Sequence, residues 1–228
     1  MGLRNPWVEN TVLGLLDPVT DWLVRRGVHP NAITTAGFLV TCSAGLAFHW
    51  GSVPLGGLLV LLGGLFDVFD GRVARASGLA SAFGSFYDST LDRISEVVVF
   101  LGILSLYNDY RVELGDVGMI YTVLLAMAGS LMVSYTRARA EGLGIDCKVG
   151  MMQRPERIVL IGIAALFFGT LWQGLVLKGV LIAMAILTNF TAVQRIVWVY
   201  RFTRVPENAS PTPPARHEPT RSSNQGQP

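Results

Sequence analysis

Residues 67–92 read DVFDGRVARASGLASAFGSFYDSTLD and lie among runs of residues that are apolar enough to cross a membrane. This stretch contains four aspartates, Asp67, Asp70, Asp88 and Asp92. A carboxylate near the hydrocarbon core of a bilayer costs roughly 2.5–3.5 kcal/mol on insertion scales, so an acid placed there is a functional hypothesis by default. These aspartates are therefore the starting point for both fold and function.

The spacing of the aspartates predicts that they converge. Asp67 and Asp70 are three residues apart, and Asp88 and Asp92 are four apart, so each pair shares one face of a helix. Two such helices facing each other would present all the carboxylates to one point. Negative charges held that close repel unless a cation neutralises them, which favours a divalent metal bound by oxygen ligands. We expect Mg²⁺, and Mn²⁺ suits the same carboxylates.

The composition is typical of a membrane protein. Hydrophobic residues make up 51% of the 228 residues and charged residues 15%, whereas soluble domains carry about a quarter charged residues. Six segments have the length and apolarity to span a bilayer. They lie at about 33–50, 53–76, 83–107, 115–139, 156–176 and 178–202. We therefore predict an all-α integral membrane protein whose domain of six transmembrane helices covers residues 33–203.

Residues 1–32 form an arm before the first predicted span. Apolar residues recur in it at helical spacing, which suggests a helix lying in the membrane interface. They are Val8, Val12, Leu15, Leu16, Val19 and Leu23. Asp17 is placed to cap a helix that starts at Pro18 and ends at Gly27. We expect no cleaved signal peptide, because the first long apolar run begins only after residue 30.

The last residues, 204–228, are rich in Pro, Ser, Asn, Gln and Glu and contain almost no large apolar side chain, which predicts a disordered tail.

The basic residues predict the orientation of the chain in the membrane. Under the six-span interpretation the outside loops hold only Arg111 and, at an edge, Lys178. Both termini and the aspartate site are then expected to face the cytoplasm.

Written as a pattern, residues 67–92 are D-x2-D-G-x2-A-R-x8-G-x3-D-x3-D. This pattern resembles the signature of the CDP-alcohol phosphotransferases, with every defined position filled. The resemblance implies transfer of a substituted phosphate from a CDP-linked lipid to an alcohol, with release of CMP. It also implies that Asp67, Asp70 and Asp88 bind metal, that Asp92 reaches a second ion, and that Asp92 is the general base for the attacking alcohol.

The same resemblance implies a binding site for the CDP-lipid. Small side chains let a nucleotide approach the backbone closely, and an arginine offers a planar fork to phosphate oxygens. The residues expected at this site are His29, Pro30, Asn31, Ala32, Gly71, Ala74, Arg75, Ser81 and Gly84. Ser81 has an equally good interpretation as a turn or capping serine, and the arm before His29 as a simple membrane anchor.

A second cluster of residues bears on the acceptor alcohol. The segments SYTRARAEG (134–142) and MMQRPERI (151–158), with Gln194-Arg195, look like the phosphatidylinositol-phosphate synthase branch of the family and its archaeal-lipid counterparts. In that branch, cations at Arg137, Arg154 and Arg195 hold the phosphate of inositol 1-phosphate. The chain departs from many bacterial members by having Arg rather than Lys at 137. Arg195 stands in an apolar run without a nearby acid, so it needs a partner, and an anionic phosphate would supply one.

The sequence thus predicts an enzyme, active as a homodimer in the cell membrane, that makes phosphatidylinositol phosphate from CDP-diacylglycerol and inositol 1-phosphate with two bound metal ions. Glycerol 3-phosphate is the main alternative acceptor, because it also needs a phosphate pocket. The lipid could carry diacylglycerol or an archaeal ether. A cation transporter would be expected to show inverted repeats, and we see none in the sequence. A catalytically dead scaffold would be expected to lack motif residues, and every motif position is filled. We expect no nucleic-acid partner.

Overall fold

The computed structural model describes residues 14, 16–109 and 117–204, and within them the chain is all-helical, as predicted. Its elements are α2 (Asp17–Arg25), α3 (Pro30–His49), α4 (Val53–Ala76), α5 (Ala82–Asp109), α6 (Val117–Glu141), α7 (Arg154–Phe168), the 3₁₀ helix η1 (Leu171–Gly174) and α8 (Leu175–Thr203). The predicted disorder from residue 205 onward, and the apolar positions Val8, Val12 and Leu15, lie outside the described residues.

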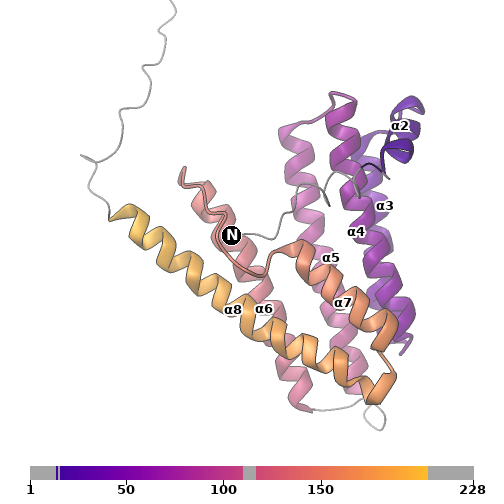
Figure 1. Ribbon diagram of the computed structural model, residues 1–228, viewed down its shortest axis with the longest axis vertical. Helices are drawn as coiled ribbons and strands as arrows, with labels where there is room; N and C mark the ends of the chain where they lie inside the picture. Colours follow the sequence, from indigo (N-terminus) through magenta and orange to yellow (C-terminus); the bar gives the residue numbers. More distant parts are fainter. Residues whose placement is uncertain (1–13, 15, 110–116, 205–228) are drawn as a thin grey trace, which may run out of the picture.

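The helices α3 to α8 pack in a closed order. α3 contacts α4 and α5, α5 contacts α6, α6 contacts α8, and α7 contacts both α8 and α4. Figure 1 shows that α8 runs obliquely, so that its C-terminal end lies away from the C-terminal end of α4. The bundle is therefore spread apart at the end where α4 is followed by α5, which is the end that carries the aspartates.

Glycines allow neighbouring helices to approach closely. A Cβ atom at Gly102 of α5 would lie 2.1 Å from the carbonyl oxygen of Gly45 in α3. A Cβ at Gly57 of α4 would lie 2.7 Å from the carbonyl oxygen of Gly162 in α7. Small residues at helix crossings are the means by which membrane helices pack tightly, because lipid offers no hydrophobic drive for their association.

Four helical segments among the described residues are long and apolar enough to cross a membrane. They are Pro30–His49, Val53–Ala76, Val117–Glu141 and Leu171–Thr203. α5 is long enough, but four charged residues lie within it, Asp88, Asp92, Arg93 and Glu96. α7 has 15 residues, about 22 Å of helix, which is short of a hydrocarbon core roughly 30 Å thick.

The predicted fifth span, 156–176, is wrong at its C-terminal end. α7 ends at Phe168, and the chain then reverses direction through η1. Trp172 and Gln173 adopt left-handed backbone angles there (φ 50° and 56°), followed by Gly174 at φ 70°. Left-handed conformations are uncommon for side chains of this size. The predicted span runs through this turn because the segment is apolar on the whole, although Gly169-Thr170 and Gln173-Gly174 interrupt it and are the local signal that was missed.

α2 follows the predicted arm helix with a small shift. Leu16 occupies the N-cap position and Asp17 is the first helical residue, whereas Gly27 follows the helix with φ 67°, as its predicted terminator. Arg72 of α4 pairs with the carboxylate of Asp17 and donates to the hydroxyl of Thr20 at 3.4 Å. α2 is therefore fastened to the end of α4 that bears the aspartates.

The connection between α6 and α7 is exposed over much of its length but is anchored by buried side chains. Ile145 and Cys147 are buried in a small apolar cluster that Trp198 of α8 also contacts. In Figure 1 the segment runs back along α6 before α7 begins. As a result, Arg154 at the first position of α7 starts inside the bundle, next to α4 and α5.

Substituting Gly57 tests the close contact between α4 and α7. A Cβ there would lie 2.4 Å from the backbone nitrogen of Leu166, and backbone atoms cannot move aside cheaply. Gly57→Ala is expected to destabilise the protein by about 1–3 kcal/mol, as overpacking does. Thermal unfolding of the purified protein in detergent would measure this. Gly179→Ala is the control, since nothing lies within 4 Å of its Cβ position; equal melting temperatures would contradict the packing.

Candidate active site

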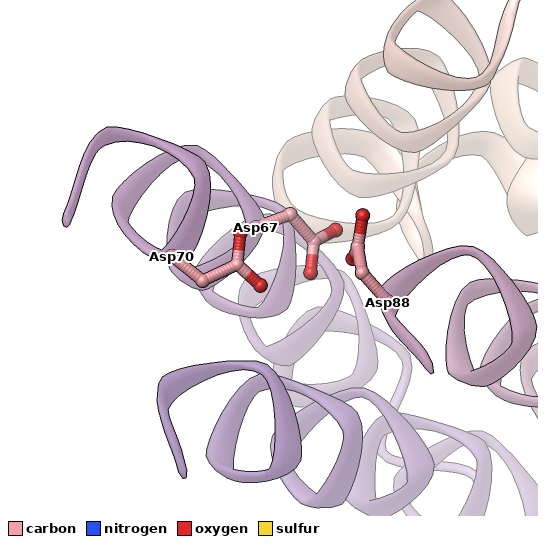
Figure 2. Close-up of side chains that lie close together, drawn as sticks. All are labelled: Asp67, Asp70 and Asp88. Carbon is pink, nitrogen blue, oxygen red and sulfur yellow. The ribbon is translucent and has the colours of Figure 1, made fainter. Parts of the chain in front are cut away.

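Three of the four aspartates that the spacing predicted to converge come together. Asp67 and Asp70 stand in the last turns of α4, and Asp88 stands in the first turns of α5. One oxygen from each carboxylate lies within 4.8 Å of the others. Figure 2 shows the carboxylates of Asp67 and Asp88 turned toward each other, with that of Asp70 beside them.

This group of oxygens fits a divalent cation. All three ligands are carboxylates, the donors that Mg²⁺ and Mn²⁺ prefer. Oδ1 of Asp88 is buried and has no hydrogen-bond partner, which is costly for a charged oxygen unless a cation faces it. Asp70 is itself buried, with 6% of its surface exposed. The residues present therefore satisfy the demands of a metal site.

Thr34 of α3 belongs to this site and was missed by the sequence analysis. Its hydroxyl donates a hydrogen bond to Oδ2 of Asp70 at 2.6 Å, and its side chain is buried. Such a bond fixes the orientation of a metal-binding carboxylate. The sequence signal was weak: a threonine four residues after Pro30, in a helix with no periodic polar face.

Asp92 lies outside the group of three carboxylates and pairs with an arginine. Nη2 of Arg154 donates to Oδ1 of Asp92 at 2.6 Å, and Nη1 donates to Oδ2 of Asp67 at 2.8 Å. Arg154 thus joins the expected base to an expected metal ligand, from the first position of α7. A second metal reached by Asp92 stays a prediction.

A cleft of about 230 Å³ opens beside the aspartates. Its walls come from the start of α3, the end of α4 and the start of α5. The expected CDP-lipid residues that line it are Pro30, Asn31, Gly71, Ala74, Arg75, Ser81 and Gly84. Asp70 and Asp88 line it as well. His29 and Ala32 are not among the lining residues; His29 instead caps α3, its Nδ1 accepting from the backbone N–H of Asn31 at 3.2 Å.

A side chain at either glycine of the cleft would press against polar side chains that line it. A Cβ at Gly84 would lie 3.1 Å from Oγ of Ser81 and 3.4 Å from Oδ1 of Asn31. A Cβ at Gly71 would lie 3.3 Å from a guanidinium nitrogen of Arg75. Ser81 also accepts a hydrogen bond from the backbone N–H of Gly84 at 3.0 Å, so it acts as a cap for α5 while it lines the cleft.

The other two expected phosphate-binding arginines lie between α6 and α8. Arg137 pairs with Glu141, one turn along α6, at 2.8 Å. Arg195 is buried, and the premise that it lacks a partner within the chain is wrong. Its Nε donates to the carbonyl oxygen of Val149 at 2.8 Å, and its Nη1 donates to that of Val133. Backbone carbonyls cannot be foreseen as partners from residue types.

Residues 27–194 match the family described as CDP-alcohol phosphatidyltransferase. The chain is also 40% identical over 186 residues to the archaetidylinositol phosphate synthase of Methanothermobacter thermautotrophicus, covering 82% of this chain and 89% of that protein. It is 31% identical over 192 residues to the phosphatidylinositol phosphate synthase of Mycobacteroides abscessus, covering 82% of this chain and 84% of that one.

Solved structures give the same relationship. The crystal structure of the Mycobacterium tuberculosis phosphatidylinositol phosphate synthase with CDP-DAG bound matches with a TM-score of 0.72 at 29% identity, covering 86% of this chain and 97% of that chain. The same synthase in complex with manganese and citrate matches with a TM-score of 0.72 at 28% identity, covering 86% and 92%.

Removing the hydroxyl of Thr34 tests the metal site. Thr34→Val keeps the shape of the side chain but loses the bond to Asp70, so the affinity for Mn²⁺ is expected to fall about tenfold, as for other supporting bonds of metal ligands. Titration with Mn²⁺, following the paramagnetic signal of the free ion, measures this. Thr34→Ser retains a hydroxyl and is the control. Equal affinities in the two variants would show that the bond does not support metal binding.

Proposed function

Because the chain belongs to the CDP-alcohol phosphatidyltransferase family, we propose that it transfers the phosphatidyl group of CDP-diacylglycerol to inositol 1-phosphate, giving phosphatidylinositol phosphate and CMP. Family membership makes the chain an enzyme rather than a cation transporter or a scaffold. The observation that carries the proposal is the group of three carboxylates, of which Asp70 and Asp88 also line the 230 Å³ cleft beside them.

The names of the relatives favour inositol 1-phosphate as the acceptor alcohol. One relative is named for archaetidylinositol phosphate and another for phosphatidylinositol phosphate, so the two differ in the lipid and agree in the inositol phosphate. This agreement supports inositol 1-phosphate over glycerol 3-phosphate for the present chain. It leaves the lipid open between a diacylglycerol and an archaeal ether.

The cleft would hold the CDP end of the lipid substrate. The guanidinium of Arg75 is placed to bind phosphate oxygens, and Gly71 and Gly84 leave the backbone open to the nucleotide. Asp67, Asp70 and Asp88 would hold one or two Mg²⁺ or Mn²⁺ ions. When bound, such a cation offsets the charge of the pyrophosphate and of the departing CMP.

Asp92 would act as the base that takes the proton from the acceptor hydroxyl. Its carboxylate is 12% exposed, so it is shielded from bulk water but can still be reached. Arg154 orients this carboxylate through a 2.6 Å hydrogen bond. The remaining N–H groups of Arg154, with Arg137 and Arg195, would bind the acceptor phosphate and so bring the acceptor hydroxyl to Asp92.

The membrane arrangement follows from the same helices. We propose that α3 to α8 all cross the bilayer, α7 as a short helix covered by α4 and α8, and that the exposed Val19 and Trp22 of α2 lie in the interface. The spread end of the bundle would face the cytoplasm, with both termini. A homodimer remains our expectation.

The acceptor is tested by measuring CMP release from CDP-diacylglycerol by the purified enzyme with Mg²⁺. Inositol 1-phosphate, free inositol, glycerol 3-phosphate and serine are compared side by side. We expect no turnover with free inositol or serine, because neither carries a phosphate for the arginines to bind. Of the two phosphorylated acceptors we expect inositol 1-phosphate to be preferred, since the relatives are named for inositol phosphate products. If glycerol 3-phosphate is the preferred acceptor, the proposed role of the aspartates still holds, but the assignment of inositol 1-phosphate as the acceptor is wrong.

Asp92→Asn tests the base. The amide cannot accept the proton, so the turnover number is expected to fall by about 10²–10⁴-fold while CDP-diacylglycerol still binds. Binding is measured separately, by the shift in melting temperature that CDP-diacylglycerol causes. Asp146→Asn is the control, since Asp146 forms an exposed ion pair with Lys148 on the surface. Full activity in Asp92→Asn would remove Asp92 as the base.

A further inference from the structure

A second ion pair lies one turn deeper in the bundle than the pair between Asp92 and Arg154. Arg157 of α7 and Glu96 of α5 meet in a two-pronged contact, Nε to Oε1 at 2.8 Å and Nη2 to Oε2 at 3.1 Å. Arg157 is buried, with 1% of its side chain exposed. The charge of Arg157 is therefore paired with Glu96 and shielded from solvent.

The two ion pairs form a ladder between α5 and α7. Along α5, Glu96 follows Asp92 by four residues, and along α7, Arg157 follows Arg154 by three, so each pair of side chains shares one helix face. The backbones of α5 and α7 do not pack closely as those of α4 and α7 do. Long side chains therefore set the register between these two helices.

Arg157 also holds the segment that precedes α7. Its Nη1 donates to the carbonyl oxygen of Met152 at 3.2 Å. Three residues earlier, the carbonyl oxygen of Val149 accepts from Nε of Arg195 at 2.8 Å. The Arg157–Glu96 pair is thus connected to both sides of the expected acceptor site, to Arg154 through α7 and to Arg195 through residues 149–152.

Arg157 and Glu96 themselves do not reach the substrate. A small, partly open cavity lined by Glu96, Arg154 and Arg157 has a volume of about 30 Å³, enough for water but not for a sugar phosphate. An inositol phosphate does not fit there. Any effect of this pair on the reaction must therefore pass through the groups it holds in place.

The pair is not explained by stability alone. Replacing a buried ion pair by apolar side chains of similar size is often neutral or stabilising, because both charges lose hydration when they are buried. Two-pronged contacts of arginine with a carboxylate do fix geometry closely. Their position behind Asp92 and Arg154 points to alignment as their contribution.

We propose that Arg157 and Glu96 are positioning residues that align Arg154 and the 149–152 segment for binding of the phosphorylated acceptor. The proposal rests on the proposed function, since it assigns the acceptor end of the site to these groups. It predicts that disrupting the pair weakens binding of the acceptor and leaves binding of the CDP-lipid unchanged, because the CDP-lipid cleft is built from α3, α4 and α5.

The test is the double variant Glu96→Leu with Arg157→Met, which removes both charges and retains volume. The KM for inositol 1-phosphate is expected to rise at least tenfold and kcat/KM to fall by up to about 10²-fold, the cost of a small misplacement of binding groups. The KM for CDP-diacylglycerol and the melting temperature in detergent are expected to stay unchanged. The control is Asp146→Leu with Lys148→Met, which removes an exposed ion pair.

A folded double variant with wild-type acceptor kinetics would overturn the proposal. If the double variant does not fold, Glu96→Gln, which keeps the shape and one acceptor oxygen, is judged by the same separation of the two KM values. Wild-type enzyme in the same assay tests the proposed function separately. If it prefers another phosphorylated acceptor, the proposed function is wrong in its acceptor, and the variants are then compared on that acceptor.

Discussion

The concentration of negative charge between α4 and α5 constrains the rest of this structure. Carboxylate oxygens of Asp67, Asp70 and Asp88 lie within 4.8 Å of one another, where two unit charges repel by about 3.5 kcal/mol at an effective dielectric constant of about 20. The chain offsets part of this itself, through Thr34 of α3 and Arg154 of α7. Both α3 and the start of α7 must therefore converge on α4, and the charge that they leave unbalanced is what a divalent cation would offset.

The packing around Asp67 shows how that convergence is achieved. Gly37 of α3 lies so close to α4 that a Cβ there would be 2.7 Å from Cβ of Phe66, the residue before Asp67. On the other side, a Cβ at Gly64 would lie 2.8 Å from the side chain of Ile158 in α7. Glycine on each side lets two helices approach the same acidic turn. The spread of the bundle at this end leaves room for substrates while the helix contacts below it hold the carboxylates in place.

The parts of the site that depend on local spacing could be predicted from the sequence. Aspartates three and four residues apart, on two consecutive helices, meet because helical geometry leaves little alternative, and the residues between them line the cleft for the same reason. The contacts of Thr34 and the pairing of Arg157 with Glu96 could not be foreseen. They join helices far apart in sequence, and any of several arginines could have served. The short α7 was missed because its terminating turn uses left-handed angles at Trp172 and Gln173, in a run whose hydropathy reads as continuous helix.

Arg154 explains physically why a phosphorylated acceptor suits this site. It binds Asp67 and Asp92 through its two terminal nitrogens, and its Nε is buried without a hydrogen-bond partner. A planar guanidinium can face a phosphate while it still holds a carboxylate, which a lysine ammonium cannot do with the same geometry. Its positive charge would then lie between the acceptor phosphate and the base and reduce their mutual repulsion. An alcohol without a phosphate would gain nothing from this arrangement. The proposed acceptor is thus consistent with the same distribution of charge that brings Asp67, Asp70 and Asp88 together.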